Sequence, residues 1–518
     1  MAAKASTPYP EGMAEAQDML TKQLGSGVDE AKQEELREMA QFDTVRAERY
    51  KTAETYYDGA QPKYIDDRLR AFLEVSGIPY GENFCETVVD ALVERLSVIG
   101  FSSENEKYAD WLWTDWYDSN VGDVLQLTLH LETAKKGDGY IILDWDADKN
   151  LCRAYFNRPE GICPCYHEGD LTHVIKVWDC EDKSPTNPKG ERIRRMNLYY
   201  PDRVEKWFAV SGEGRNQKQV WGRWMDDGDK VWPIDWTYQG KPLGIPVFHF
   251  ANKARGDHMG RPEHYGTIPQ QDRLTKELLD LASIMDQLGY PQRYATGFAG
   301  TNDLKTAPGE VWSTPSEGGA FGQFDAANPD GPLGAVNATL QRIATRSNTP
   351  AHRFTLTGGY PSGEALKVSE AGLVAKCRNR QTTWGGTWAE MCQMATAITI
   401  VFAGGSGEGP GVTMDELMKT TVNVTWADAE SRNEKEHLET LGLMHELGVS
   451  KTTLLAMMPG IDPVKEKELR QAEDEEGAAR GAQMMGMGLL PPKDPNAPLS
   501  KADAKPPVNG GPPKPFGE

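Results

Sequence analysis

The chain has 518 residues, of which 39% are hydrophobic and 26% are charged. At roughly 150 residues per domain, this length predicts about three domains or one large, elaborated one. The longest apolar runs, such as 141–143, are far shorter than the ~18 residues that a membrane span needs. Composition therefore excludes collagen, mucin and membrane-channel proteins. The first residues lack the apolar core of a secretory signal, which predicts a protein made in the cytoplasm.

Charge is the strongest global signal, because 56 Lys and Arg residues against 77 Asp and Glu residues leave a net charge of −21. Proteins that grip DNA through its phosphates are basic, so this chain should repel DNA on average, although local basic patches remain open. Its seven cysteines are odd in number and scattered, which predicts reduced thiols rather than a disulfide framework. Cys163 and Cys165 form the one close pair, and they lack the CxxC spacing and the second pair of ligands that structural zinc requires.

The first 135 residues are predicted to be largely helical. Residues 29–50 are rich in Ala, Glu, Lys and Gln, and we expect one helix that leads into the fold without contributing to a core. Apolar residues at steps of three and four predict a second helix over 83–96, and 98–101 follows as a short strand. Further helices are expected at 104–116 and 123–135.

A β region is predicted from 139 to about 252, where short apolar stretches alternate with Pro, Gly, Asn and Asp turns. That spacing is typical of a meander or a sandwich-like sheet. Six tryptophans fall in the region, and their ordinary role is packing of the sheet and core, with stacking on a sugar or a base as the alternative. They are Trp178, Trp207, Trp221, Trp224, Trp232 and Trp236. Strands are expected at 140–145, 151–156, 172–178, 196–200, 204–210, 220–225 and 246–250.

A helical hairpin is predicted in the middle of the chain. Five apolar residues spaced four, three, four and three apart mark a narrow seam along a helix over 269–288. They are Leu274, Leu278, Leu281, Met285 and Leu288. A second helix over 333–347 returns from the excursion, and it ends before Pro350.

The excursion between these helices is rich in Gly and Pro, with short strands expected at 292–296 and 311–314. Between residues 300 and 334 it is also acidic, because one base and five acids give a net charge of 1 − 5 = −4. These residues are Asp303, Lys305, Glu310, Glu317, Asp325 and Asp330.

Beyond the hairpin, a loop over 353–363 precedes a very long helix over 364–402, which the Gly385–Gly386 pair is expected to kink. A strand is expected at 422–426. Residues 491–518 contain nine prolines in 28 residues and are predicted to be disordered. Acidic helices are expected at 429–447, 451–457 and 463–481.

Motifs of common enzymes are absent or weak. No GxxxxGK[ST], HExxH or GxSxG motif occurs. His258 and His264, each beside an acidic residue, could ligate a metal ion, but nothing else fixes such a site and surface histidines are the simpler interpretation. The paired carboxylates of Asp144 and Asp146 could serve a glycosidase, whereas acidic pairs at a strand end are common.

Three segments carry a resemblance to a known family. The first, 83–101, reads NFCETVVDALVERLSVIGF, and the second, 268–297, opens with IPQQDRL. The third begins at Pro350 and continues over 362–388 from SGEALK. In this order and spacing, over about 50–470, they resemble the portal proteins of tailed bacteriophages, in particular the large portal family of long-tailed phages of Gram-positive and actinobacterial hosts.

The resemblance implies an α+β portal fold with a mixed α/β wing, a paired-helix stem, a small α/β clip, a long kinked wing helix and an α-helical crown. It divides the chain into an N-terminal helical arm (1–49), the first part of the wing (50–265), a stem helix (266–289), the clip (290–333), a second stem helix (334–349), a tunnel loop (350–363), the wing helix and strand (364–427), the crown (428–485) and a disordered Pro-rich tail (486–518).

The resemblance also implies a dodecameric ring at one capsid vertex of the virion, assembled in the host cytoplasm. Double-stranded DNA would pass through it without sequence specificity during packaging, retention and ejection. Implied partners are the terminase large subunit, a head-tail connector or adaptor protein, and the major capsid and scaffolding proteins. No membrane, metal, cofactor or catalytic residue is implied.

Three groups of residues receive roles from the resemblance. The seam residues from Leu274 to Leu288 would pack the stem, and the six clip residues from Asp303 to Asp330 would dock the terminase or the connector. The DNA-facing residues of the tunnel loop would be Arg353, Thr355, Leu356, Thr357, Gly358, Gly359 and Tyr360.

Acidity fits a conduit, because an acidic lumen keeps DNA mobile rather than bound. Two other classes stay open. One is a different virion structural protein, such as a capsid or minor head component, which would lack the stem hairpin. The other is an acidic, tryptophan-rich carbohydrate-active hydrolase, which would carry a carboxylate pair in a cleft.

Overall fold

The computed structural model describes residues 30–41, 44–61, 82–181, 192–210, 220–224, 234–254, 256, 258–289, 293–297, 318–324, 328–354, 363–403, 409–430, 441–448, 454 and 466. Contacts divide the chain into two units, Met1–Ser431 and Arg432–Glu518. In the second unit, residues 441–446 are helical, which accounts for part of the helix predicted over 429–447. The expected helix at 463–481 and the tail at 486–518 lie almost wholly outside the described residues.

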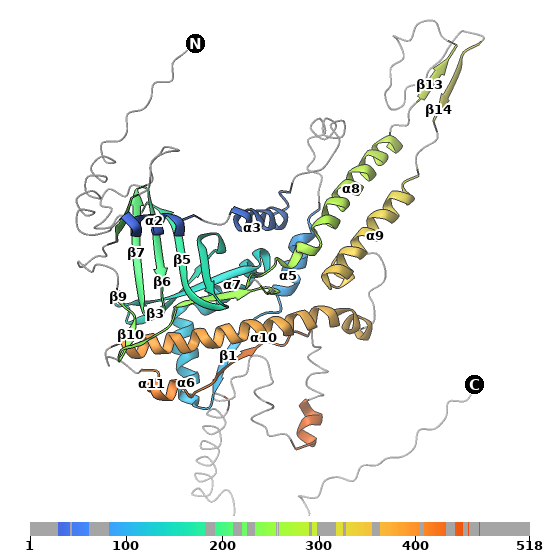
Figure 1. Ribbon diagram of the computed structural model, residues 1–518. Helices are drawn as coiled ribbons and strands as arrows, with labels where there is room; N and C mark the ends of the chain where they lie inside the picture. Colours follow the sequence, from blue (N-terminus) through green and yellow to red (C-terminus); the bar gives the residue numbers. More distant parts are fainter. Residues whose placement is uncertain are drawn as a thin grey trace, which may run out of the picture. The chain divides into compact units, whose positions relative to one another are not determined.

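The β elements of the first unit form two main antiparallel sheets (Figure 1). One sheet has the strand order β4-β5-β6-β7-β8, with β9 paired to β7, and the other has the order β12-β2-β3. Because consecutive strands of the larger sheet are neighbours, the predicted meander is confirmed. The bounds are β2 Asp138–Asp146, β3 Leu151–Asn157, β4 Ile162–His167, β5 Asp170–Cys180, β6 Ile193–Tyr199, β7 Arg203–Val210, β8 Trp221–Arg223, β9 Ile234–Asp235 and β12 Val247–Ala251.

The principal helices of the first unit are α2 Glu30–Met39, α3 Thr44–Tyr57, α5 Phe84–Val93, α6 Glu106–Trp111, α7 Gly122–Lys136, α8 Ile268–Gly289, α9 Asp330–Ser347, α10 Gly363–Phe402 and α11 Met414–Leu417. Several of these helices, among them α5, α8, α9 and α10, lie where apolar periodicity predicted them. Three short strand pairs complete the described fold: β1 Val98–Ser103 with β15 Val422–Trp426, β10 Thr237–Tyr238 with β11 Lys241–Pro242, and β13 Arg293–Thr296 with β14 Ala320–Gln323. None of the described helices is both long and apolar enough to cross a membrane.

The long helix α10 supplies one wall of the largest core. Its apolar residues recur at steps of three and four, so they share one face of the helix. That face packs against α5, β2 and β12, and Trp388 donates to His130 of α7 at 3.2 Å. The residues at its centre are each at most 1% exposed: Trp384, Trp388, Met391, Ala395 and Ile398.

The N-terminal segment differs from the prediction of one helix that makes no core. The segment is divided, since α2 ends at Met39 and α3 begins at Thr44. Leu36 of α2 is fully buried against the large sheet. The side-chain amide of Gln33 donates to the carbonyl oxygen of Trp221 at 2.7 Å, and its oxygen accepts from the Trp221 N–H at 2.9 Å. That interpretation is therefore wrong, because one leucine and one glutamine fix an otherwise polar helix to the sheet.

The tryptophans of the β region mostly have the expected packing role. Trp207, Trp221, Trp224 and Trp236 are at most 6% exposed, and Trp178 is partly buried. Trp232 lies outside the described residues.

Candidate functional site: a helical hairpin and its buried charged base

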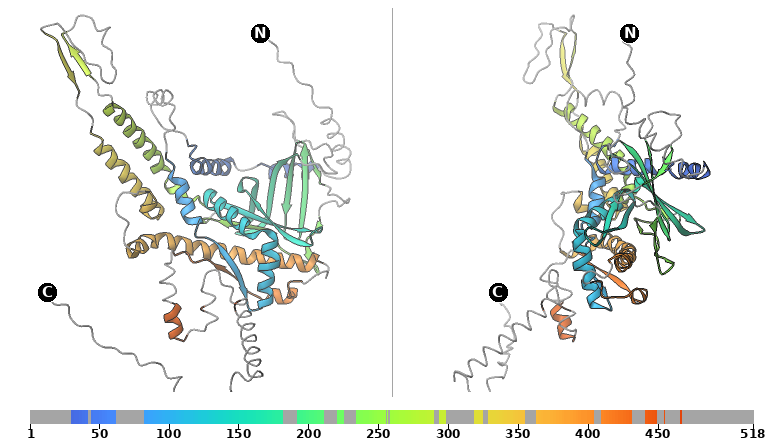
Figure 2. Two further views of the ribbon diagram at one scale, coloured as in Figure 1. Left: turned by 180° about the vertical axis from the view of Figure 1, so that it is seen from behind. Right: turned by 90° about the vertical axis from the view of Figure 1, so that its left-hand side faces the viewer.

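Helices α8 and α9 lie side by side and form the predicted hairpin, with β13 and β14 in the segment that joins them (Figures 1 and 2). They begin and end within three residues of the predicted bounds. Their shared core contains Leu274, Val336, Leu340 and Ile343, each at most 8% exposed. The hairpin is therefore held together by side chains of one chain.

The predicted seam is buried at one end of α8 and exposed toward the other. Leu274 is fully buried, while Leu278 and Leu281 are partly buried against the same cluster. Met285 is 55% exposed, and the side chain of Leu288 is outside the described part of the structure. Leu279, which the heptad-like spacing missed, is only 2% exposed, so the buried stripe is wider than the seam.

Other exposed apolar side chains lie at the same distal end of the hairpin. Leu333, in the first turn of α9, is 49% exposed. Tyr294 of β13 stacks at a tilt on Phe324, which follows β14, with ring centroids 5.1 Å apart, and both remain exposed. The described part of the chain leaves this end uncovered.

The base of the hairpin is instead closed by a buried charged cluster. Glu263 is 2% exposed and lies in the 3-10 turn Glu263–Gly266 just before α8. Its carboxylate accepts from Lys376 at 2.9 Å, from Lys253 at 2.9 Å and from Arg380 at 3.2 Å. The ammonium of Lys376 also donates to the carbonyl oxygen of Ser347, the last residue of α9, at 2.6 Å. One cluster thus joins the start of α8, the end of α9 and the middle of α10.

Electrostatics at this base favour the ionised carboxylate. Burial would raise the pKa of Glu263, but the nearby charges of Lys376, Lys253 and Arg380 lower it to about 2. A buried carboxylate with three cationic donors is satisfied, and removal of either side would leave uncompensated charge. Sequence reasoning did not find this cluster.

The metal hypothesis for His258 and His264 is not supported, and the surface interpretation is wrong for His264. His264 is fully buried, and its Nε2 lies 3.0 Å from the carbonyl oxygen of Ala53. His258 is exposed and stacks on Tyr166, with ring centroids 4.2 Å apart. Among the described residues, no group of three or more His, Cys, Asp or Glu side chains is arranged to hold a metal ion.

The segment predicted as the tunnel loop leaves α9 from a fixed base. Arg353 donates to the carboxylate of Glu94 at 2.7 Å. Phe354 is 8% exposed and packs on Phe84 with an edge-to-face geometry at 5.5 Å. The predicted DNA-facing residues from Thr355 to Tyr360 lie outside the described residues.

The acidic clip residues are also largely beyond the described ranges. Asp330 is the first residue of α9 and is exposed. The other five, which lie outside the described residues, are Asp303, Lys305, Glu310, Glu317 and Asp325.

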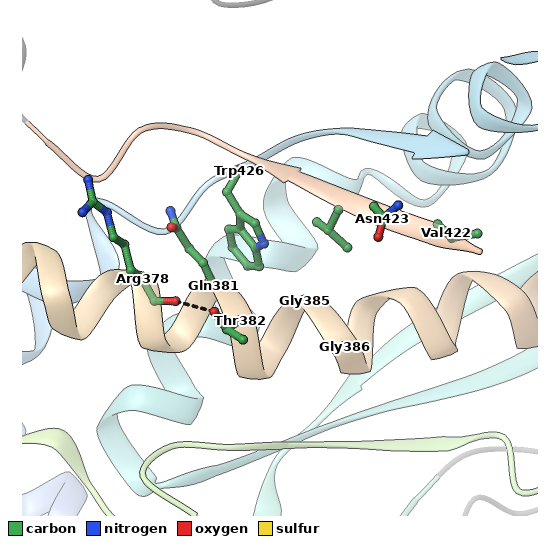
Figure 3. Close-up of a pocket in the computed structure, with 9 residues that line it drawn as sticks. Arg378, Gln381, Thr382, Gly385, Gly386, Val422, Asn423 and Trp426 are labelled. Atoms are coloured by element: carbon green, nitrogen blue, oxygen red, sulfur yellow. Dashed lines mark hydrogen bonds between the residues drawn. The ribbon is translucent and has the colours of Figure 1, made fainter. Parts of the chain in front are cut away.

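A groove of about 600 Å³ lies between α10 and β15 (Figure 3). α10 continues without a break through Gly385 and Gly386, and a Cβ on Gly385 would lie 3.2 Å from Nε1 of Trp426. The first glycine therefore lets the strand approach the helix closely. The one charged side chain in the lining, Arg378, pairs with Glu430 at 2.6 Å. Among the described residues that line the groove there is no carboxylate, so they do not supply the carboxylate pair of a hydrolase.

The carboxylates of Asp144 and Asp146 have local roles at the end of β2. Asp144 accepts from the N–H of Trp145 at 2.9 Å, and Asp146 accepts from the N–H of Lys149 at 3.1 Å. The contact of Asp146 is typical of a turn, whereas Asp144 lies within β2 and also acts on the nearby charge of Lys176.

Comparison with known proteins gives a consistent result. A family model described as phage portal protein, SPP1 Gp6-like, matches residues 39–481. The chain is 23% identical over 465 residues to the portal protein of Mycobacterium phage D29, which covers 82% of each chain. It is 22% identical over 447 residues to the portal protein of Mycobacterium phage L5, which covers 81% of this chain and 83% of the relative.

Solved structures similar to this chain come from two GTA particles. One is the neck of the native particle computed with C12 symmetry, with a TM-score of 0.39 and 11% identity over 80% of this chain and 99% of that chain. The other is the neck of the empty particle computed with C6 symmetry, with a TM-score of 0.40 and 10% identity over 77% of this chain and 95% of that chain.

Proposed function

The chain belongs to the phage portal protein family, and we propose that twelve copies form the DNA conduit at one vertex of the capsid. The family match over residues 39–481 carries this assignment. The hairpin of α8 and α9, with its β13–β14 excursion, fits it better than the alternative virion proteins, which would lack a stem. Ring contacts of this kind are heterologous, so each copy presents two different faces to its neighbours.

The proposed division of the chain follows the elements. Residues 266–289 and 334–349 form the stem, and 290–333 form the clip. Residues 50–265 and 364–427 form the wing, the crown is 428–485, and α2 within the N-terminal arm packs on the wing sheet. The buried charged base then lies where stem and wing meet, and it fixes their connection within one copy.

The distal end of the stem is the part that needs other copies. Met285 and Leu333 are exposed in the single chain, at 55% and 49%. Exposed apolar side chains gathered at one end of a hairpin are typical of association surfaces. We assign them to contacts between neighbouring stems, where the seam from Leu274 to Leu288 would become buried along its whole length.

The role in DNA passage is mechanical rather than catalytic. An acidic conduit forms few phosphate contacts, so DNA slides. The force for packaging comes from a separate terminase. The terminase and the connector each dock on the acidic clip. Capsid and scaffolding proteins contact the outside of the ring. The mature ring belongs to the virion, and assembly takes place in the host cytoplasm.

The tunnel loop, 350–363, tests this role most specifically. Replacing Thr357–Tyr360 with a Gly-Ser linker should leave rings intact, because the loop base at Arg353 and Phe354 is retained, yet reduce DNA packaging or retention in particles. Adding lysines through Thr355→Lys and Thr357→Lys should slow DNA passage by creating phosphate contacts, with an effect that weakens as salt rises. Normal packaging by both variants would show that the loop only connects two helices.

A further inference from the structure

Strand β15 has one paired edge, and its other edge faces away from its partner. Among the described strands it pairs only with β1, in a two-stranded sheet. The N–H of Ala427 donates to the carbonyl oxygen of Ser97 at 2.8 Å. Both main-chain groups of Val98 instead bond to the side chain of Gln126 on α7. Because Val98 is paired with Trp426, this pair exchanges no hydrogen bonds, and the main-chain groups of Trp426 point away from β1.

The same direction recurs at every second residue of β15. Successive residues of an antiparallel strand turn their main-chain groups to opposite edges, and the extra residue of the bulge lies on β1. Val422 and Val424 therefore face the same way as Trp426, whereas Asn423 and Thr425 face β1. No described residue forms a main-chain hydrogen bond with Val422, Val424 or Trp426 on the outer side. We call these three residues the free edge of β15.

The free edge lies beside the groove between β15 and α10 (Figure 3). The side-chain amides of Gln393 and Gln381 on α10 donate to the carbonyl oxygens of Thr420 and Ala427, each at 3.0 Å. These bonds tie both ends of the strand to the helix, and the groove of about 600 Å³ opens between them. On the helix side, a Cβ on Gly386 would have no neighbouring atom of the described chain within 4 Å. The helical wall is therefore open at that point.

The sequence of β15 lacks the features that usually protect an edge strand, which are lysine, proline and a bulge in the edge strand itself. Residues 420–427 read TTVNVTWA and contain neither a charge nor a proline. Their valines and threonines favour an extended chain. Among the described residues that line the groove, the one charged side chain is Arg378, which already pairs with Glu430 at 2.6 Å. The groove therefore matches an uncharged ligand.

We propose that the free edge of β15 binds an extended, uncharged segment of a partner protein by strand addition. The main chain of that segment would exchange hydrogen bonds with Val424 and the outward-facing residues on either side, which extends the sheet to three strands. Side chains on its inner face would lie over Gly386. Lack of charge selects this occupant, because a nucleic acid or a charged peptide would bring charges that the groove does not balance. The site lies on one subunit and does not depend on the formation of a ring.

The first test measures binding of a fluorescein-labelled heptapeptide of alternating threonine and valine to the full chain by fluorescence anisotropy. Val424→Pro should weaken binding about tenfold or more, because proline has no N–H to donate and its ring obstructs the edge. Proline is tolerated where the N–H points away from the ladder, so the pairing with β1 is retained. Val424→Thr is the matched control, since it keeps the N–H, and it should change affinity by less than about twofold.

A second pair of variants tests the helical wall without changing the strand. Gly386→Leu places a side chain in the open part of the groove and should also weaken binding about tenfold. Thr383→Leu is its control, because Thr383 is exposed on α10 but does not line the groove, and it should change affinity by less than about twofold. This pair decides the proposal even where Val424→Pro fails to fold.

Three further readouts separate strand addition from other modes of binding. A heptapeptide of the same sequence with every amide N-methylated should not bind, and one with glutamate in place of threonine should bind at least about tenfold more weakly. Amide hydrogen exchange within 422–426 should slow when the unmodified heptapeptide is added.

Equal binding of the N-methylated peptide, or equal losses of affinity in the variants and their controls, would overturn the proposal. Loss of rings in Gly386→Leu with unchanged peptide binding would assign the free edge to a second copy of this chain and would overturn it too. Ring formation by wild type is scored separately, so failure here leaves the portal assignment intact.

Discussion

The two ends of the α8–α9 hairpin differ in how their side chains are satisfied. At the base, Glu263 and Lys376 are 2% and 8% exposed and are joined by a 2.9 Å ion pair. At the distal end, Met285 and Leu333 of the same helices are 55% and 49% exposed. Ionic groups cannot remain buried without partners, so the chain supplies those partners itself. Exposed apolar side chains are tolerated in a folded subunit, and a neighbouring copy can cover them. The comparison shows which end the single chain satisfies by itself and which end it leaves exposed, and we propose that the exposed end is covered on assembly.

The largest expected effect comes from breaking the base. Glu263→Ala leaves Lys376 and Arg380 buried with no carboxylate between them, and this should lower the free energy of unfolding by about 3–5 kcal/mol. Urea unfolding of the purified variant measures the loss. Glu430→Ala removes an exposed carboxylate that also pairs with an arginine of α10, so it should change stability by less than about 1 kcal/mol. Equal losses of stability from the two substitutions would show that the buried cluster stabilises the fold no more than an exposed ion pair does.

The buried half of the seam gives the next largest effect. Leu274→Ala creates a cavity between α8 and α9, and it should cost about 2–5 kcal/mol of stability. Met285→Ala on the same helix should change the unfolding free energy by no more than about 0.5 kcal/mol, because its side chain is exposed in one subunit. Thermal or urea unfolding, under conditions that keep subunits apart, measures the loss of stability in each of the two variants. A large loss in Met285→Ala would show that the distal end is buried within the single chain.

Acid should weaken the folded subunit through two buried histidines. Burial lowers the pKa of His264 at the base and of His130 in the main core from 6.5 to about 4. Since the unfolded chain then binds more protons, stability falls as the pH drops from 6.5 toward 4, by about 2 kcal/mol for each histidine at pH 5. His264→Gln should remove about half of this pH dependence in urea unfolding. An unchanged pH dependence of stability in His264→Gln would contradict the attribution of this effect to the burial of His264.

A second acid window lies lower. The pKa of Glu263 is lowered from 4.5 to about 2, so its stabilising effect is complete above pH 4.5 and is lost as the pH falls toward 2. Loss of stability between pH 6.5 and 4.5 therefore reports the histidines rather than the base carboxylate.

The smallest effect on the single subunit should accompany the largest effect on assembly. Met285→Ser and Leu333→Ser replace exposed apolar groups, so each should leave the unfolding free energy of the subunit within about 0.5 kcal/mol of wild type. Both should nevertheless reduce ring formation, which native mass spectrometry measures. Val368→Ser is the control, because Val368 is 78% exposed near the start of α10 and lies outside the hairpin.

The long periodic elements could be predicted from sequence, because their apolar stripes are strong and local. The bounds of α8, α9 and α10 lie within three residues of expectation. The charged base could not be found this way, since Glu263 and Lys376 are 113 residues apart and neither stands out among the charged residues of an acidic chain. The helix α2 was misjudged for a related reason, because one buried leucine gives no periodic signal.

For the candidate site, sequence identified the hairpin but could not tell which part of its seam one chain buries. Spacing alone treats Leu274 and Met285 as equivalent, yet the first is fully buried and the second is exposed. That difference depends on which neighbouring elements cover each residue, which is a tertiary feature. The roles of the tunnel loop and of the acidic clip residues remain predictions.

The most direct test of the central claim is negative-stain electron microscopy of the purified wild-type chain and of a Met285→Asp, Leu333→Asp double variant. We expect rings with an axial hole from the wild type and well-folded single subunits from the variant, because charges at the distal end oppose contact between neighbouring stems. Rings of equal abundance from both proteins would contradict the claim that this end of the hairpin packs between copies.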